Sequence, residues 1–232
     1  MKVLHVYKDY FPPVKGGIEK HVNILSKGLV KRGVDVRVLV SNTKYKLEEE
    51  RHENIPVYKA PQVGRFYSAP LTPTFFYYLR RLGKDADILH FHHPNPTAEF
   101  SYFFTGLKKK VIVTYHSDII RQDRLGKIYS PFRKRFLEMA DGIIATSPNY
   151  IQTSRTLHPF KSKCTVIPLG IDLQRFQSNG DGQRIQQIRA ENENIPIILF
   201  VGCFRYYKGL HVLLSAMEDA DAKLILIGTG PE

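Results

Sequence analysis

Short apolar runs alternate with amphipathic segments along this chain, and this alternation restricts the possible folds more than any other feature. Short runs rich in β-branched residues indicate buried strands, whereas apolar residues that recur every third or fourth position indicate helices. The predicted strands of the first part span residues 2–7, 34–40, 57–59, 87–92, 110–116, 142–146 and 165–168. The predicted helices span residues 18–32, 75–82, 97–106 and 125–140, and a further helix begins after Ser147. Strands that alternate with helices predict an α/β fold with a parallel sheet covered on both faces.

A polar stretch at residues 174–194 separates this part from a second strand–helix–strand pattern. The second pattern comprises residues 196–202, 209–217 and 223–228. We therefore predict an N-terminal domain over 1–173, a linker over 174–194 and part of a second domain over 195–232. Because two strands and one helix are too few to bury a sheet on both faces, we expect the second domain to be incomplete.

The composition indicates a globular protein in a reducing compartment. Hydrophobic residues make up 43% of the chain, which is enough for a core. The two cysteines, Cys164 and Cys203, lie in different predicted domains, so we expect no structural disulfide. The apolar run at 3–7 is too short for a secretory signal, and no run approaches the roughly 20 apolar residues that cross a bilayer. We expect a cytoplasmic protein, free or peripheral on a membrane, whose net charge of +12 attracts anions.

Two glycines stand between the first predicted strand and the first predicted helix. Gly16 and Gly17 directly precede the helix, and Glu19, in its first turn, is expected to line the cleft on the acceptor side. Unpaired amides and the positive end of the helix dipole attract anions, and glycine lets a phosphate approach the backbone. We interpret this turn as a diphosphate-binding site. A flexible turn that only starts a helix is the alternative, because the G-x-G-x-x-G pattern is not present.

Histidines stand at the ends of two predicted strands. His116 can donate a hydrogen bond to a sugar hydroxyl or a phosphate, and Asp118 can orient the histidine or accept from a hydroxyl. His90, His92 and His93 lie together in the preceding strand. We interpret His92 as part of a polar strand end that lines a cleft, since no cysteine or carboxylate stands at metal-ligand spacing. A metal site formed by these three histidines is the alternative.

A further candidate follows the first strand of the second domain. Arg205 and Lys208 lie in the loop that leads to the next helix, where a planar guanidinium and a compact ammonium together suit a diphosphate leaving group. Two solvated loop charges are the alternative. Asp172, at the junction of the domains, is expected to fix the linker or to face the cleft.

Taken in order, these segments resemble the large group of retaining GT-B glycosyltransferases called family 4, which includes bacterial mannosyl- and glucosyltransferases of surface polysaccharide assembly. The resemblance rests on residues 16–19, 115–118, 140–147, 167–172, 201–209 and 226–232. Each segment is weak alone, but the ordered set is specific and extends over the whole chain. The resemblance implies a GT-B fold, with a complete N-terminal Rossmann-like domain and the first β-α-β unit of a second one.

The resemblance also implies roles for the candidate residues. The amides near Gly16 and Gly17 would bind the donor diphosphate, and His116 would lie beside the transferred sugar. Arg205 and Lys208 would stabilise the departing diphosphate, so neither a metal nor another cofactor is expected. The implied reaction moves a sugar from a GDP- or UDP-linked donor to a saccharide or lipid-linked acceptor with retention, in cell-surface polysaccharide or lipopolysaccharide biosynthesis.

The sequence departs from the family in two respects. The family commonly has arginine directly after the Val-Gly pair, where this chain has Cys203, and Arg205 stands two positions later. The chain also ends before the two-glutamate motif with which the family holds the donor's sugar and ribose. We therefore expect a truncated product or a fragment that alone binds donor poorly and turns over little.

Basic residues gather near the helix predicted over 125–140, together with Tyr129 and Phe132. With the aromatic run at 75–78, they predict a basic face with aromatic anchors that docks on anionic lipid headgroups, as a lipid-linked acceptor on the inner face of a membrane would require. An ordinary solvated helix face is the alternative. The basic residues are Arg121, Arg124, Lys127, Arg133, Lys134 and Arg135.

Four other functions compete with sugar transfer. Epimerases and phosphorylases share the fold, but epimerases use a different set of cleft carboxylates, and we find no pyridoxal lysine. A nucleic-acid-binding module would explain the positive charge, but the chain has no basic recognition helix, zinc pattern or aromatic RNA-binding signature, so no nucleic acid is expected as a partner. A non-catalytic remnant that serves as a partner or binding module is the alternative to an enzyme.

Overall fold

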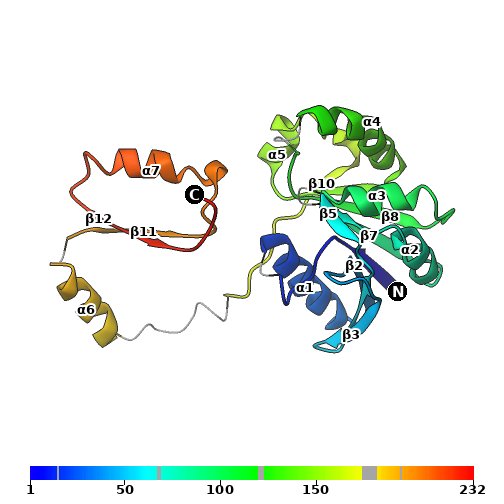
Figure 1. Cartoon of the computed structure of the whole chain (residues 1–232), viewed down its shortest axis with the longest axis horizontal. Helices are drawn as coiled ribbons and strands as arrows, with labels where there is room; N and C mark the ends of the chain where they lie inside the picture. The colour runs from blue at the N-terminus through cyan, green and yellow to red at the C-terminus, as the bar shows by residue number, and fades with distance from the viewer. Residues whose placement is uncertain (15, 67–68, 120–122, 174–181, 194) are drawn as a thin grey trace. The chain divides into compact units, whose positions relative to one another are not determined.

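The chain divides into two compact units, Met1–Asp172 and Leu173–Glu232 (Figure 1). The computed structural model describes residues 1–14, 16–66, 69–119, 123–173, 182–193 and 195–232, without the side chains of 123–125.

An eight-stranded sheet forms the centre of the first unit, with its strands in the order β10-β9-β8-β7-β1-β2-β4-β3. Neighbouring strands are parallel except for β3 and β4, which are antiparallel. This arrangement confirms the predicted α/β fold. The strands are β1 (Lys2–Val6), β2 (Asp35–Ser41), β3 (Glu48–His52), β4 (Ile55–Ala60), β7 (Ile88–His93), β8 (Lys110–Tyr115), β9 (Gly142–Ala145) and β10 (Cys164–Val166).

Helices connect these strands near the predicted positions. Two of them begin at side-chain caps: Ser147 Oγ accepts from the amide of Tyr150 at 3.2 Å, and Asn95 Oδ1 accepts from the amide of Ala98 at 3.4 Å. Such caps satisfy backbone donors that the helix itself leaves unpaired. The helices are α1 (Gly17–Val30), α2 (Phe75–Gly83), α3 (Pro96–Tyr102), α4 (Asp123–Met139), α5 (Pro148–Thr153) and the 3-10 helix η1 (His158–Lys163).

Two hydrophobic clusters cover opposite faces of the sheet. The larger cluster packs α2, α3 and α4 against strand residues that include Leu4 and Phe91. The smaller cluster packs Val22 of α1 against residues that include Val38 and Val57. Because successive strand residues point to opposite faces, His5, which lies between Leu4 and Val6, points to the α1 face.

The sequence analysis missed the short antiparallel elements of this unit. Strand β3 has the sequence Glu-Glu-Glu-Arg-His, which lacks the β-branched and aromatic residues that mark strands. The two-residue turn to β4 places Glu53 and Asn54 at positive φ, as a type I′ hairpin requires, but without the usual glycine. The hairpin β5 (Gly64–Phe66) and β6 (Ala69–Leu71) was also missed.

The second unit contains the predicted strand–helix–strand pattern. Strands β11 (Ile197–Val201) and β12 (Lys223–Ile227) pair in parallel, with η3 (Tyr206–Lys208) and α7 (Leu210–Ala216) between them. Of the predicted linker, residues 174–181 and 194 lie outside the described part, and α6 (Gly182–Glu191) occupies most of the rest. Among the described residues, no helix has both the length and the apolar character needed to cross a membrane.

Candidate functional site

The glycine turn leads directly into α1, as predicted. Gly16 is the N-cap residue with extended backbone, and Gly17 is the first helical residue. A Cβ atom at Gly16 would overlap the carboxylate of Glu19, whereas a Cβ at Gly17 would meet no heavy atom within 4 Å. Gly16 therefore lets Glu19 fold back over the helix start, and Gly17 leaves open space beside it.

The Glu19 side chain lies where an anion would be most stable near the helix start. The residue is buried, and this burial raises the pKa of its carboxyl group above the usual value, while its own amide and Lys8 act in the opposite direction. A helix N-terminus favours negative charge. A phosphate bound at Gly16 and Gly17 would therefore compete with the Glu19 carboxylate or require it to be protonated.

An ion pair fixes the loop that follows β1. The buried carboxylate of Asp9 binds Arg65 of β5 through two contacts, Oδ1 to Nη2 at 2.5 Å and Oδ2 to Nη1 at 3.1 Å. A cavity of about 370 Å³ adjoins this loop, with Asp9, Asn42, Glu48 and Lys59 among its lining residues. The sequence analysis did not identify Arg65, because its partner lies 56 positions away in the chain.

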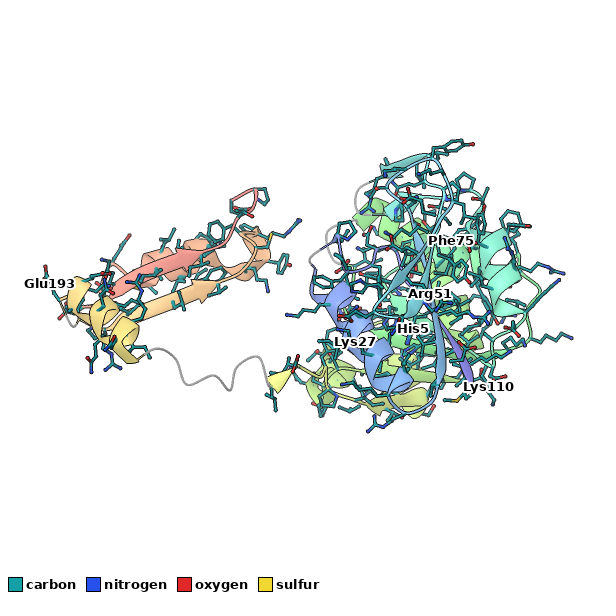
Figure 2. The ribbon with its side chains drawn as sticks, turned by 90° about the horizontal axis from the view of Figure 1, so that it is seen from below. His5, Lys27, Arg51, Phe75, Lys110 and Glu193 are labelled. Atoms are coloured by element: carbon teal, nitrogen blue, oxygen red, sulfur yellow. The ribbon has the colours of Figure 1, made fainter. Side chains whose placement is uncertain are left out.

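Five histidines gather on the face of the sheet that α1 covers: His5 of β1, His21 of α1, His90 and His92 of β7, and His116 after β8. Nδ1 of His5 lies 3.1 Å from Nε2 of His92, and Nδ1 of His92 lies 3.1 Å from Nε2 of His116. The His21 ring contacts the His116 ring with centroids 5.3 Å apart. Figure 2 labels His5 within the first unit. We call these five residues the histidine cluster.

Burial keeps the histidine cluster neutral. It lowers the pKa of His5 and that of His116 to about 3, with further lowering by neighbouring histidines. Burial likewise lowers the pKa of His92 well below its usual value. A neutral imidazole has one donor nitrogen and one acceptor nitrogen, so His92 must donate on one side and accept on the other. His5 and His92 therefore determine which nitrogen of His116 carries its proton.

Two of the sequence interpretations need correction. His92 is fully buried and does not line an open cleft, although it contacts His116. Asp118 accepts hydrogen bonds from the hydroxyls of Tyr115 at 2.7 Å and Ser154 at 3.1 Å, and its amide donates to Tyr150. The described partner of His116 is His92. Of the two roles expected for Asp118, it therefore accepts from hydroxyls, here of protein side chains, and does not orient His116.

The predicted trio of His90, His92 and His93 does not gather at one point. His93 points to the opposite face of the sheet, where its Nδ1 lies 2.9 Å from the buried carboxylate of Glu99. That carboxylate also accepts from the Asn95 amide at 2.9 Å and from the hydroxyl of Tyr129. The alternation of strand side chains could have shown this split, and the same rule places His5 beside His90. His21 was missed because its contact with His116 joins a helix to a distant strand.

In the second unit, Arg205 directly precedes η3 and Lys208 is its last residue. Both are exposed. Nζ of Lys208 lies 5.5 Å from the centroid of the Tyr207 ring. The loop is held against the end of β12, where the Phe204 amide donates to the Thr229 carbonyl at 2.9 Å. A Cβ atom at Gly230 would overlap the Phe204 backbone, so glycine is required for this close approach. Asp172 is the last residue of the first unit and is exposed.

The predicted basic face is only partly described. Arg121 lies outside the described residues, as does the side chain of Arg124. Lys127 and Lys134 are exposed, Arg133 is half-buried, and Arg135 lies 3.5 Å from Glu138.

Exposed phenylalanines lie on α3 and α4 and in the segment after α3. The Phe100 ring contacts the rings of Phe104 and Phe132 at centroid distances of 5.0 and 5.5 Å. A groove of about 450 Å³ adjoins them, with Leu71 and Phe76 also in its lining. Basic and aromatic side chains therefore share the part of the first unit formed by α2, α3 and α4.

Comparison with known proteins places the chain among glycosyltransferases. Residues 15–175 match Glycosyltransferase Family 4. The chain is 37% identical to O-antigen chain mannosyltransferase C of Escherichia coli, covering 100% of this chain and 62% of that protein. It is also 37% identical to D-rhamnosyltransferase WbpZ of Pseudomonas aeruginosa, covering 100% of this chain and 60% of that protein. The chain thus spans about three fifths of the length of these curated relatives.

Solved structures show the same fold. Sucrose-phosphate synthase of Thermosynechococcus elongatus has a TM-score of 0.70 at 19% identity, with 97% of this chain and 61% of that chain covered. Anabaena HepE, solved in complex with UDP-glucose, has a TM-score of 0.68 at 17% identity, with 99% of this chain and 61% of that chain covered. These likenesses confirm the predicted GT-B fold. The match over residues 15–175 shows that the chain belongs to glycosyltransferase family 4.

Proposed function

We propose that this chain contributes the acceptor-side domain and part of the donor-binding domain of a retaining glycosyltransferase. The enzyme moves a sugar from a GDP- or UDP-linked donor to a saccharide or lipid-linked acceptor during lipopolysaccharide O-antigen assembly. The name of the relative from Escherichia coli, an O-antigen chain mannosyltransferase, supports this choice of pathway, and the relative from Pseudomonas aeruginosa is a D-rhamnosyltransferase.

The observation that carries the proposal is the contact between α1 and the end of β8. His21 lies in the second turn of the helix that Gly16 and Gly17 begin, and its ring contacts His116. The glycine turn and His116 therefore lie at the same edge of the sheet, the carboxyl edge at which α/β sheets bind ligands. A donor whose diphosphate binds the glycine turn would have its sugar near His116.

Each residue has a separate task in this proposal. The amides of Gly16 and Gly17 bind the diphosphate, and His116, which stays neutral, exchanges a hydrogen bond with the transferred sugar. Arg205 and Lys208 stabilise the negative charge that develops on the departing diphosphate. The polar cavity beside Asp9 and Asn42 is a candidate for binding hydroxyls of the acceptor.

The test is a donor screen on the protein expressed from its complete open reading frame. GDP-mannose, GDP-D-rhamnose and UDP-glucose are each incubated with a lipid-linked saccharide acceptor, and release of the nucleoside diphosphate is measured. We expect release from at least one donor. NMR of the product should show that the transferred sugar keeps the anomeric configuration it had in the donor. Inversion of that configuration, or no release from any of the three, would contradict the proposal.

The aromatic and basic side chains of α3 and α4 support a membrane-bound acceptor. We predict that the protein floats with vesicles containing anionic lipid and that salt weakens this binding. Each basic residue near such a surface contributes about 1 kcal/mol, so Lys127→Glu with Lys134→Glu should weaken binding by about 30-fold or more. The matched control is Lys31→Glu with Arg32→Glu at the exposed end of α1, which should bind vesicles more strongly than the first pair. Equal loss in both pairs would show that only net charge matters.

A further inference from the structure

The histidine cluster contains two sets of three imidazoles at distances suited to a shared ion. His5, His90 and His92 form one set, and His21, His92 and His116 form the other. Within each set, the nearest ring nitrogens lie within 4.8 Å of one another. Zinc bound tetrahedrally at about 2.0–2.1 Å from each nitrogen would separate its ligand nitrogens by roughly 3.3 Å. Nδ1 of His92 and Nε2 of His116 are already 3.1 Å apart.

Several ring nitrogens of the cluster lack a partner. Nδ1 of His21, Nδ1 of His116 and Nε2 of His5 are all inaccessible to solvent and have no hydrogen-bond partner among the described residues. Buried polar atoms are almost always satisfied, so the unpaired Nδ1 of His21 indicates a missing ion or water beside it, whereas an ion on Nε2 of His116 would leave Nδ1 of that ring unpaired.

We propose that His21, His92 and His116 form a binding site for a divalent transition metal of the class of Zn²⁺, Co²⁺ or Ni²⁺. Three neutral imidazoles suit these ions, whereas Mg²⁺ and Ca²⁺ prefer oxygen ligands. Three protein ligands leave a fourth position open, as in sites that accept an exogenous ligand. The family resemblance leads us to expect no metal in sugar transfer itself, so this site adds a property to the protein.

Two features favour this set over the deeper one. His21 and His116 are only partly buried, which gives an ion a route from solvent, whereas His5, His90 and His92 are all buried. His5 also supplies an outer contact for the ligand His92, because its Nδ1 lies 3.1 Å from Nε2 of His92. Metal-binding histidines usually donate their second nitrogen to such a partner, which fixes the ring and its tautomer.

The site would make donor binding sensitive to metal. This consequence rests on the proposed function, in which His116 contacts the transferred sugar. An ion held by His116 would engage the same imidazole and would compete with the donor. Metal binding itself does not depend on that assignment and can be measured without any transfer reaction.

The experiment titrates Co²⁺ into the full chain, purified without a histidine tag and stripped of metal with a chelator. We expect visible d–d absorption that saturates at one ion per chain, with an intensity typical of four- or five-coordinate Co²⁺. The variant His21→Ala should bind at least about 100-fold more weakly, because loss of a ligand exceeds the 10–100-fold effect of outer contacts. His21→Gln, which keeps a polar side chain, should lose affinity similarly.

The matched control is His158→Ala, which removes an exposed histidine from η1 of the same unit and should leave the titration unchanged. Circular dichroism and thermal unfolding verify that each variant is folded. Two results would overturn the proposal: no saturable absorption in the parent chain, or unchanged affinity in His21→Ala, which can be combined with loss of affinity in His90→Ala. That combination would assign the ion to the deeper set.

Discussion

Replacing Glu99 by alanine is expected to lower the free energy of unfolding by about 3–5 kcal/mol, because removal of one partner leaves other buried polar groups unpaired. Glu99 is 1% exposed, and its carboxylate accepts from His93, the Asn95 amide and Tyr129. Alanine would leave all three donors without this acceptor in a region that water does not reach. We expect the loss in urea denaturation followed by tyrosine fluorescence, since the chain has no tryptophan.

Glu49→Ala is the matched control for that measurement. Glu49 is exposed on β3, and its loss should change the free energy of unfolding by less than about 0.5 kcal/mol. A change of less than about 1 kcal/mol in Glu99→Ala would show that the network around His93 rearranges or hydrates without the carboxylate.

The same carboxylate should make the first unit sensitive to acid. Burial alone would raise the pKa of Glu99, but the His93 charge and the hydrogen bonds from His93, Tyr129 and Asn95 outweigh burial and leave that pKa below its usual 4.5. A carboxyl group whose pKa is lower in the folded state stabilises the fold above the unfolded pKa. Its contribution is lost as pH falls below that value through the folded pKa. The difference between the parent and Glu99→Ala should therefore shrink in denaturation measured at decreasing pH.

Replacing His116 by alanine is expected to lower the transfer rate by about 10²–10³-fold, the usual cost of removing one hydrogen-bonding group aimed at the reacting centre. The prediction concerns kcat/KM of the protein from the complete open reading frame, with the best donor of the screen. His116→Asn, which keeps a short polar side chain, should recover part of the rate. Because burial lowers the pKa of His116 to about 3, its protonation should not contribute to the pH–rate profile near neutrality.

The control is again His158→Ala, whose histidine lies in η1 and is exposed. An unchanged kcat/KM in a folded His116→Ala protein would remove His116 from the transfer site. An activity decline with an apparent pKa near 6.5 that disappears in His116→Ala would show that the imidazole is more hydrated during turnover than in the described structure.

Much of the fold could be predicted from local patterns. Strands β1 and β8 are largely apolar runs rich in β-branched residues, and α1 has apolar residues at helical spacing after two glycines. Strand β3 could not be predicted, because its charged residues are stabilised by pairing with β4 and not by their own propensity.

The candidate site was harder to predict because its contacts join distant segments. Sequence position identified His116 and the glycine turn, but the pairing of β1 with β7 brings His5 to His92, 87 positions away. One of the two expectations for Asp118, that it orients His116, came from the closeness of these residues in sequence. The structure instead shows that Tyr115 and Ser154 hold this carboxylate, and Ser154 comes from the segment after α5.

The two ends of the large sheet have a consequence for the behaviour of this protein at high concentration. One outermost strand, β3, presents three consecutive glutamates, and the other, β10, is only three residues long. Unpaired outer strands can recruit strands from other molecules and start aggregation, and charge or brevity prevents this recruitment. Neutralising Glu48, Glu49 and Glu50 should therefore promote intermolecular β-structure while leaving the interior of the sheet intact.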